Sequence, residues 1–217
     1  MNGAPVRVLL ADDHAVVREG YRRLLERTSG IEVIAEASSG EQTYRLFCEC
    51  APDVVVMDIN LPGMSGVEAT RRIVAREPSA KVLVFSMHED VVFPSRALEA
   101  GARGYLTKSS APEVLVEAVR AVAQGRIYLS HDVAQKLAVR VLPGQQVPLG
   151  ELSPREFEVF RLLAEGKAVP DIARILSLSQ KTVANYQSLV KQKLEADTSA
   201  QMVWIALQHG LLQREPE

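Results

Sequence analysis

An apolar run that ends on a carboxylate and then turns is the first stretch of this chain that could do chemistry. In PDVVVMDINLPGMSG, residues 52–66, four apolar residues precede Asp58, and Pro62, Gly63 and Gly66 follow it. The run is too short for a helix and rich in β-branched residues, so it predicts a strand buried on both faces. Asp58 is therefore expected at the end of a core strand, where open α/β folds bind their ligands. An isolated aspartate there would more often cap a turn, so its neighbours decide its role.

Apolar strands alternate with amphipathic helices over the first 125 residues. Strands are predicted at 6–11, 32–35, 54–58, 81–86 and 103–106, with helices near 15–27, 41–50, 66–76, 90–100 and 112–124. Five βα units of this period predict a doubly wound, five-stranded parallel sheet with helices on both faces. The carboxyl ends of parallel strands lie at one edge, so the polar residues that follow them should converge. These residues are Asp12, Asp13, Asp58, Ser86 and Lys108.

Three carboxylates, a hydroxyl and an amine at one edge have the chemistry of a metal and phosphoryl site. Carboxylates this close cannot all stay ionised without a compensating cation, and oxygen ligands beside an open position suit Mg²⁺. Asp58 can act as the nucleophile that takes a phosphoryl group, Lys108 can neutralise its oxygens, and Ser86 can donate a hydrogen bond. The backbone carbonyl of Asn60 is a further candidate metal ligand. Ser86 or Lys108 alone would more often be an ordinary polar residue at a strand end, but the set together favours a site.

The motifs at these strand ends resemble those of a known family. LLADDH, VVVMDINLPGMSG, SMHE and GYLTK are similar to the motifs of the receiver domain of bacterial two-component response regulators. The resemblance implies a flavodoxin-like fold and an aspartate, here Asp58, that is phosphorylated by a histidine kinase. It also implies that Asp12 and Asp13 hold Mg²⁺ and that Ser86 and Lys108 bind the phosphoryl group.

Two further residues near the last strand matter to the resemblance. Tyr105 matches the family's switch aromatic, which turns inward when the hydroxyl, here Ser86, moves. Ser109 stands where many receivers have a proline in a cis peptide bond, and a cis bond to another residue costs about 2.5 to 4 kcal/mol. The isomer of the Lys108–Ser109 bond is therefore open at this point.

The composition is that of an ordinary globular protein. The 217 residues are 47% hydrophobic and 24% charged, which suits one large domain or two modest ones. The apolar run at the N-terminus is too short for a signal peptide or a membrane span, which predicts a cytoplasmic protein with no membrane partner. Cys48 and Cys50 lack the further ligands of a zinc site and are expected to be free thiols. The net charge of −2 does not by itself indicate nucleic acid.

The chain changes character after the first domain, which is predicted to span 1–125. Residues 126–149 are predicted to be a linker, because Pro143, Gly144 and Pro148 punctuate it, although 132–141 could form a short helix. A second domain is predicted at 150–217.

Four helices are expected in this second, all-α domain. Ser153 and Glu156 form a capping box before the first helix, and a short second helix is predicted at 170–176. A turn at 177–179 leads to a third helix near 180–194, and Thr198 with Gln201 caps a fourth. Two short helices joined by such a turn predict a helix-turn-helix, whose second helix can lie in the DNA major groove.

The third helix of this domain has the residues to meet DNA. Between 177 and 194 there are three lysines and no acid, and Asn and Gln side chains favour adenine. The residues predicted to contact DNA are Ser179, Gln180, Lys181, Thr182, Asn185, Gln187, Ser188 and Lys191. A small protein-binding bundle would share the bare helix-turn-helix pattern, and this interaction module stays the main alternative.

The second domain carries a resemblance of its own. LSPREFEVFRLLAEGKAVPDIARILSLSQKTVANYQSLVKQKL, residues 152–194, closely resembles the DNA-binding domain of the LuxR/NarL group, which commonly follows a receiver. Ala184, Tyr186 and Pro170 depart from several relatives, which leaves particular base contacts open.

Taken together, the two resemblances imply a transcription factor whose binding to double-stranded DNA is controlled by phosphorylation of Asp58. A homodimer is expected in the phosphorylated state, because two helix-turn-helix units one DNA turn apart read a longer site. A phosphatase that uses Asp58 as its nucleophile is a weaker alternative, since such enzymes place a second aspartate where this chain has Asn60. The chain is therefore not expected to be an enzyme.

Overall fold

The structure is a computed structural model and describes residues 4–140, 148–209 and 211–212. The chain divides between Val139 and Arg140 into two units, each described here by itself. Within the described ranges, no helix has both the length and the apolar character needed to cross a membrane.

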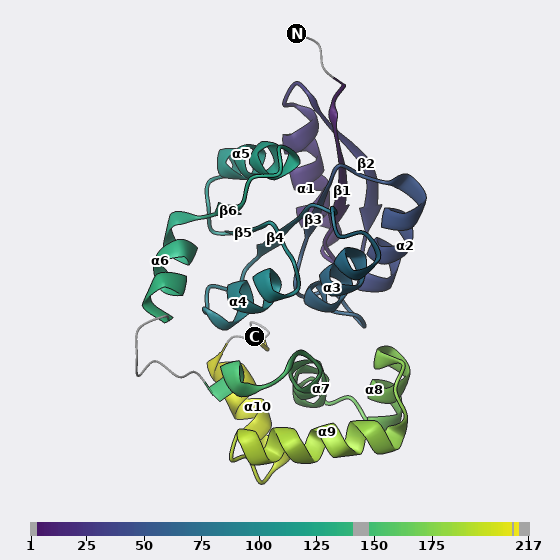
Figure 1. The fold of residues 1–217 in the computed structure, drawn as a ribbon, viewed down its shortest axis with the longest axis vertical. Helices are drawn as coiled ribbons and strands as arrows, with labels where there is room; N and C mark the ends of the chain where they lie inside the picture. Colours follow the sequence, from purple (N-terminus) through teal and green to yellow (C-terminus); the bar gives the residue numbers. More distant parts are fainter. Residues whose placement is uncertain (1–3, 141–147, 210, 213–217) are drawn as a thin grey trace. The chain divides into compact units, whose positions relative to one another are not determined.

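The first unit is built on a parallel sheet with strand order β2-β1-β3-β4-β5-β6 (Figure 1). Its strands are β1 (Val6–Ala11), β2 (Ile31–Ala37), β3 (Val54–Met57), β4 (Val82–Ser86), β5 (Gly104–Thr107) and β6 (Tyr128–Leu129). The prediction of a doubly wound parallel sheet is confirmed, and the sheet has six strands where five were predicted. Strand β6 was not predicted, because two residues are too few to form a periodic pattern.

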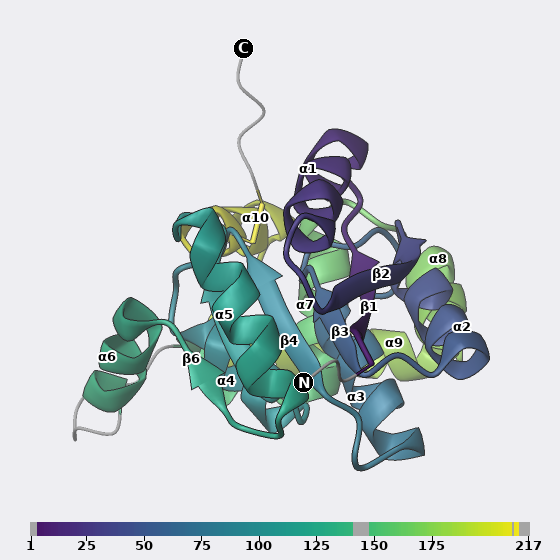
Figure 2. The same cartoon turned by 90° about the horizontal axis from the view of Figure 1, so that it is seen from above.

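Helices cover both faces of this sheet. They are α1 (Ala15–Glu26), α2 (Gly40–Cys50), α3 (Gly66–Arg76), α4 (Val92–Glu99) and α5 (Pro112–Ala123). Successive residues of a strand point to opposite faces, so Val8 and Leu10 share a core with α1 and α5, while Leu9 and Ala11 share one with α2 and α3. Figures 1 and 2 show the two helix layers on either side of the strands. Both faces of β1 and β3 are therefore buried, as their unbroken apolar runs require.

The segment predicted as a linker, 126–149, contains regular structure in its first part. β6 extends the sheet beyond β5, and α6 (His131–Arg140) follows, close to the short helix predicted at 132–141. Residues 141–147 lie outside the described residues. The first unit thus runs past residue 125 to Val139, and the domain bounds 1–125, 126–149 and 150–217 stay a prediction.

The second unit is all-helical, as predicted. Its elements are the 3₁₀ helix η1 (Pro148–Glu151), α7 (Pro154–Ala164), α8 (Val169–Leu176), α9 (Gln180–Lys193) and α10 (Ser199–Gln208). Both predicted capping boxes are present, at Ser153 with Glu156 and at Thr198 with Gln201. Pro170 lies in the first turn of α8, where a missing N–H costs no helical hydrogen bond, so this departure from relatives fits the helix.

Gly66, the first residue of α3, lies directly against the backbone of Asp58. A Cβ atom at residue 66 would lie 1.9 Å from the carbonyl oxygen of Asp58. The Gly66 N–H donates to the carbonyl of Ile59 at 3.0 Å, which closes the turn after β3. Only glycine fits at this approach of helix and strand end.

Gly66→Ala is expected to lower the free energy of unfolding by about 3 kcal/mol, because backbone must move to admit the methyl group. Urea denaturation followed by circular dichroism measures this change. Gly20→Ala, in the middle of α1, is the matched control, since a Cβ there meets nothing within 4 Å. It should raise stability by about 0.5 to 1 kcal/mol. Equal stability of the two variants would contradict the close approach at Asp58.

Candidate functional site

Lys108 joins two of the carboxylates predicted to converge. It follows β5, and its Nζ lies 2.6 Å from Asp58 Oδ2 and 2.7 Å from Asp12 Oδ2. All three side chains are almost entirely buried. The Nζ also lies 6.0 Å from the centroid of the Phe85 ring. The ends of β1, β3 and β5 thus meet in one cluster of charges, which we call the acidic cluster: the buried Asp12, Asp58 and Lys108 and the exposed Asp13.

The acidic cluster has fewer positive than negative charges. Burial by itself lowers the pKa of Lys108, but the carboxylates of Asp58 and Asp12 outweigh it, and the pKa is raised. The lysine is therefore an ammonium at neutral pH. Burial raises the pKa of Asp58, and the opposing attraction of Lys108 does not cancel this effect. One ammonium for three acids leaves a site that a further cation would stabilise.

Oxygen atoms suitable for such a cation come from the turn between β1 and α1. Asp12, Asp13 and His14 offer ligand atoms within 4.8 Å of one another. The His14 N–H donates to Asp12 Oδ1 at 2.8 Å, and its Nδ1 lies 2.7 Å from Asp13 Oδ1. His14 is also the N-cap residue of α1. The carboxylate oxygens are hard ligands and fit Mg²⁺.

Asn60 lies in the turn after β3 and contacts Asp58 through its backbone. Its N–H donates to Asp58 Oδ1 at 3.3 Å. Within the described ranges its own carbonyl accepts no hydrogen bond, so the oxygen keeps its lone pairs for another ligand. This carbonyl therefore remains available for the role in metal binding that the sequence predicts.

Ser86 and Tyr105 both meet the loop that follows β4. Ser86 ends β4, is fully buried, and its Oγ accepts the N–H of His88 at 3.3 Å. The Tyr105 ring, on β5, is also fully buried, and its hydroxyl donates to the His88 carbonyl at 2.7 Å. Burial raises the pKa of Tyr105. The tyrosine therefore faces inward here, with no hydrogen bond from Ser86 to Asp58 in the part of the chain that the structure describes.

His88 is a residue of the site that the sequence did not single out. Its Nε2 lies 2.8 Å from Asn60 Oδ1, and its ring stacks on Phe93 at a centroid distance of 3.9 Å and an angle of 11°. Burial lowers the pKa of His88 to about 4, so the ring is neutral at pH 7. The available signal was its position in SMHE, two residues after Ser86. A residue in a loop such as this one is not part of a helix or strand pattern, so its position in the site could not be predicted from hydrophobic periodicity.

The isomer of the Lys108–Ser109 peptide bond, left open by the sequence, is now defined. Among the described residues no peptide bond is cis, so the Lys108–Ser109 bond is trans. The hydroxyl of Ser109 donates to Glu89 Oε1 at 3.0 Å, and Lys136 of α6 donates to the Glu89 carbonyl at 3.0 Å. The loop after β5 and helix α6 therefore both hold the loop after β4.

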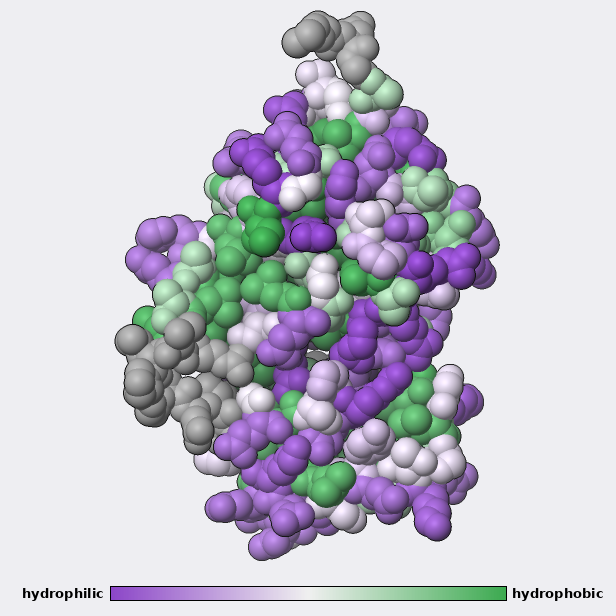
Figure 3. Space-filling view, in the orientation of Figure 1, coloured by the Kyte–Doolittle hydropathy of each residue, from purple (hydrophilic) through white to green (hydrophobic). Residues whose placement is uncertain are grey.

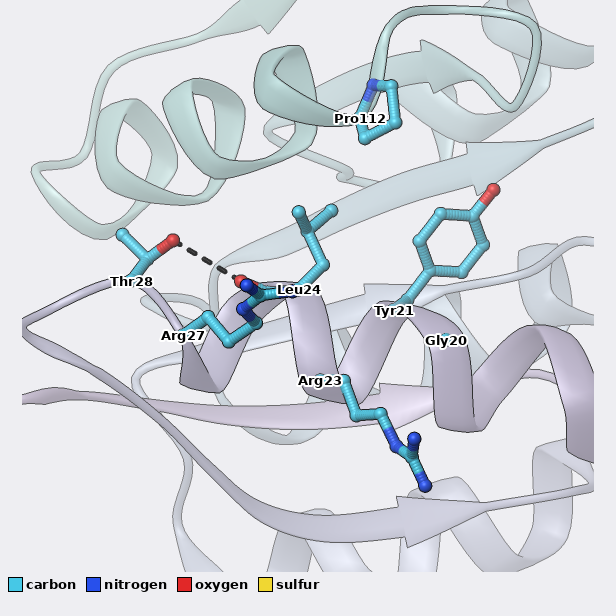
Figure 4. A pocket seen from close by; sticks show the side chains of 7 residues that line it. All are labelled: Gly20, Tyr21, Arg23, Leu24, Arg27, Thr28 and Pro112. Atoms are coloured by element: carbon cyan, nitrogen blue, oxygen red, sulfur yellow. Dashed lines mark hydrogen bonds between the residues drawn. The ribbon is translucent and has the colours of Figure 1, made fainter.

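A cavity of about 420 Å³ lies beside α1, one layer of side chains from Lys108. Its lining residues are Gly20, Tyr21, Arg23, Leu24, Arg27, Thr28 and Pro112. Figure 4 shows Tyr21 and Leu24 on the side of α1 that faces Pro112, with Arg23 pointing the other way. The Tyr21 ring packs edge-on against Phe85 at 4.7 Å. This α1 groove is thus connected through two aromatic rings to the acidic cluster.

The residues predicted to contact DNA are all in or next to α9, and their local contacts differ. Ser179 caps the helix by accepting the Thr182 N–H at 3.0 Å. Ser188 donates to the Ala184 carbonyl at 3.1 Å, and Lys191 donates to the Asp197 carbonyl at 3.3 Å. Three predicted contact residues are exposed, and their side chains have no hydrogen bond or ion pair within the described residues: Gln180, Lys181 and Asn185. Gln187 is half-buried.

Lys193, the third lysine of α9, is used inside the domain. Its Nζ lies 2.7 Å from the Glu156 carboxylate and 3.2 Å from the Glu151 carbonyl. Tyr186, which departs from relatives, packs against the core formed by α7, α8 and α9. The face of α9 visible in Figure 3 is mostly hydrophilic with small apolar patches. The N-terminal half of α9 is therefore the part whose side chains are available to a partner.

Comparisons with known proteins assign both units to families. Residues 8–120 match the response regulator receiver domain, and residues 150–206 match the luxR family of bacterial regulatory proteins. The chain is 37% identical to the response regulator UvrY of Escherichia coli K12 over 97% of both chains. It is 43% identical to the transcriptional activator protein ExaE of Pseudomonas putida, over 94% of this chain and 97% of ExaE.

A solved structure agrees with these matches. RcsB from Salmonella enterica serovar Typhimurium, bound to a promoter in the presence of the phosphomimetic BeF₃⁻, is 26% identical with a TM-score of 0.75, over 93% of this chain and 98% of RcsB. The receiver match precedes the luxR-family match along the chain, and the similarity to named regulators extends over nearly their whole length. Together these findings establish the family of the chain. The chain belongs to the two-component response regulators and is a transcription regulator with a receiver domain and a LuxR-type DNA-binding domain.

Proposed function

We propose that Asp58 accepts a phosphoryl group from a histidine kinase and that this controls DNA binding. The observation that carries the proposal is the buried contact of Lys108 with both Asp58 and Asp12. An oxygen of Asp58 forms the new O–P bond as the P–N bond to the kinase histidine breaks. Lys108 then neutralises charge on the phosphoryl oxygens, and Ser86 turns to donate a hydrogen bond to one of them.

Mg²⁺ is proposed to bind beside Asp58, where the charge balance favours a further cation. Its ligands would be the carboxylates of Asp12, Asp13 and Asp58 and the carbonyl of Asn60. When bound, Mg²⁺ offsets negative charge on the phosphoryl oxygens. The oxygen donors and the excess of acids over bases support this choice of ion.

The kinase is proposed to dock on α1. The α1 groove offers an apolar floor beside the exposed Arg27, and Val16 at the start of the helix is 88% exposed. Arg18, Arg22 and Arg23 make ion pairs with Glu36 and Glu19 and so present a surface of mixed charge. An exposed apolar residue next to a groove is typical of an interaction site.

Double-stranded DNA is the proposed partner of α9, with its N-terminal half in the major groove. The phosphorylated chain is proposed to form a homodimer. Trp204 on α10 is 60% exposed, and Leu189 on α9 is 42% exposed. These two side chains offer apolar surface to a second copy. We propose no enzymatic activity, and a cytoplasmic location stays a prediction from the sequence.

Lys181→Ala is expected to weaken binding to specific and random DNA alike. The lost phosphate contact should make the slope of log K against log salt shallower by about 0.9. Lys193→Ala is the matched control, because that lysine pairs with Glu156 inside the domain. The Lys193→Ala variant should have lower thermal stability and the same slope of log K against log salt as the unaltered protein. Equal slopes for Lys181→Ala and the unaltered protein, measured by fluorescence anisotropy, would remove Lys181 from the interface.

Asn185→Ala tests base reading rather than phosphate contact. The exposed amide can both donate a hydrogen bond to adenine and accept one from it. Such a contact is worth about 1 to 3 kcal/mol of discrimination against other bases. Selection of bound fragments from random DNA should therefore show relaxed preference at one position per half-site. Identical selected sequences before and after the substitution would contradict this role.

The interaction-module alternative makes a different prediction for the whole protein. A mobility shift with fragmented genomic DNA and acetyl phosphate should retain specific fragments if the second domain reads DNA. Retention of none, with Asp58 labelled normally, would instead favour a protein partner. The phosphatase alternative is disfavoured, because the position two residues after Asp58 is an amide held by His88.

A further inference from the structure

His88 contacts three parts of the site from one buried position. Its ring is hydrogen-bonded to Asn60, its backbone N–H donates to Ser86, and its backbone carbonyl accepts from the Tyr105 hydroxyl. We propose that His88 is a positioning residue that holds Asn60 for Mg²⁺ binding beside Asp58. The inference rests on the proposed phosphoryl-acceptor function of Asp58 and adds a residue to which that function had assigned no role.

The contact between His88 and Asn60 has a defined direction. An amide oxygen only accepts hydrogen bonds, so the Nε2–H of His88 donates to Asn60 Oδ1 at 2.8 Å. His88 is 6% exposed, and its ring is stacked in parallel on Phe93, which removes freedom to rotate away. A buried hydrogen bond is electrostatically stronger than an exposed one. The imidazole therefore fixes the side chain of Asn60 from outside the acidic cluster.

Fixing this side chain also fixes the backbone on either side of it. The Asn60 N–H donates to Asp58 Oδ1, and the neighbouring Ile59 carbonyl accepts from both Leu61 and Gly66. Those backbone contacts define the turn up to Ile59, whereas the Asn60 carbonyl accepts no hydrogen bond within the described ranges. His88 supplies the remaining restraint on the residue whose carbonyl would face the metal.

His88 is itself restrained from the opposite side. The hydroxyl of Tyr105 donates to its carbonyl at 2.7 Å, and the Oγ of Ser86 accepts its N–H at 3.3 Å. The backbone of His88 is thus attached to Ser86 of β4 and Tyr105 of β5, while its ring reaches the turn after β3. Partners that orient a metal ligand in this way typically contribute about 10-fold or more to metal affinity.

The test compares Mg²⁺ binding by the full-length protein, three single variants and one double variant, using isothermal titration calorimetry with MgCl₂. His88→Phe keeps a ring for the stack on Phe93 but lacks the donor, and should weaken Mg²⁺ binding about 10-fold. Asn60→Ala removes the acceptor and should weaken binding by a similar factor. His88→Gln keeps a neutral donor and should restore most of the affinity. The double variant His88→Phe, Asn60→Ala should bind like either single variant.

A second measurement separates positioning from a general loss of structure. Labelling by acetyl phosphate should need about 10-fold more Mg²⁺ for half-maximal rate in His88→Phe, with the rate at saturating Mg²⁺ retained. Unchanged Mg²⁺ affinity in His88→Phe, or effects of the two single variants that multiply in the double variant, would overturn the inference. Absence of Mg²⁺ binding or labelling in the unaltered protein would instead contradict the proposed function, so the two failures are distinguishable.

Discussion

Asp58→Asn is expected to abolish phosphorylation by acetyl phosphate and Mg²⁺. The unaltered protein should gain one phosphoryl group by intact mass, and the variant none, because an amide oxygen is a poor nucleophile at this position. The substitution preserves the shape of the side chain and one of its oxygens, so loss of labelling would report chemistry rather than folding. Phosphoryl transfer from a histidine kinase should likewise not occur in the variant.

The chain supplies a matched control for this experiment at the other end of the same strand. Asp53 precedes β3, and its carboxylate accepts the Arg7 N–H at 2.8 Å, far along the strand from Lys108. Asp53→Asn should be labelled to the same extent as the unaltered protein. Undiminished labelling of Asp58→Asn would refute the assignment, and loss of labelling in both variants would point to a shared folding defect.

Removal of the receiver is expected to activate DNA binding. A fragment of residues 147–217 should bind the target without a phosphodonor, about 5- to 150-fold more tightly than the unphosphorylated full-length protein. This range corresponds to a coupling free energy of about 1 to 3 kcal/mol, typical of coupled sites. The physical reason is the hypothesis that the unphosphorylated receiver blocks the DNA-binding or dimerising surface. The fragment can be tested because α7, α8 and α9 share a core of their own.

Fluorescence anisotropy with the selected DNA provides the measurement. The full-length Asp58→Asn variant is the control, because it should stay weak in binding whether acetyl phosphate is present or not. If the fragment binds no better than the unphosphorylated protein, inhibition is the wrong hypothesis. Phosphorylation would then act by pairing receivers, and sedimentation of the labelled full-length protein would show the dimer.

Much of the fold was predictable because its signals are local. The runs that became β1, β3 and β4 are apolar on both faces, and the capping boxes at Ser153 and Thr198 fixed two helix starts. The convergence of Asp12, Asp58 and Lys108 followed from a topological rule rather than from their spacing. Such features are predictable because they depend only on short stretches of sequence or on the order of the strands and helices.

What the sequence did not predict depends on contacts between distant residues. Asn60 and His88 are 28 positions apart, and nothing in the sequence between them indicates their hydrogen bond. Trp204 appears apolar enough for a core, yet α10 places Met202 and Ala206 inward and leaves the indole exposed. Lys193 is one of the three lysines counted between residues 177 and 194, but its ammonium pairs with Glu156 in the first turn of a different helix. Tertiary packing decides each of these cases.

Because the two-residue strand β6 pairs with β5, β5 is not an edge strand of the sheet. Without it β5 would be the last strand and would present unpaired backbone groups to any strand of another chain. Instead the carbonyls of Arg103 and Tyr105 accept the N–H groups of Tyr128 and Ser130. β6 itself is too short to serve as a template for a further strand. This edge of the sheet is thereby protected from pairing with a strand of another chain, so an association across it would depend on side chains.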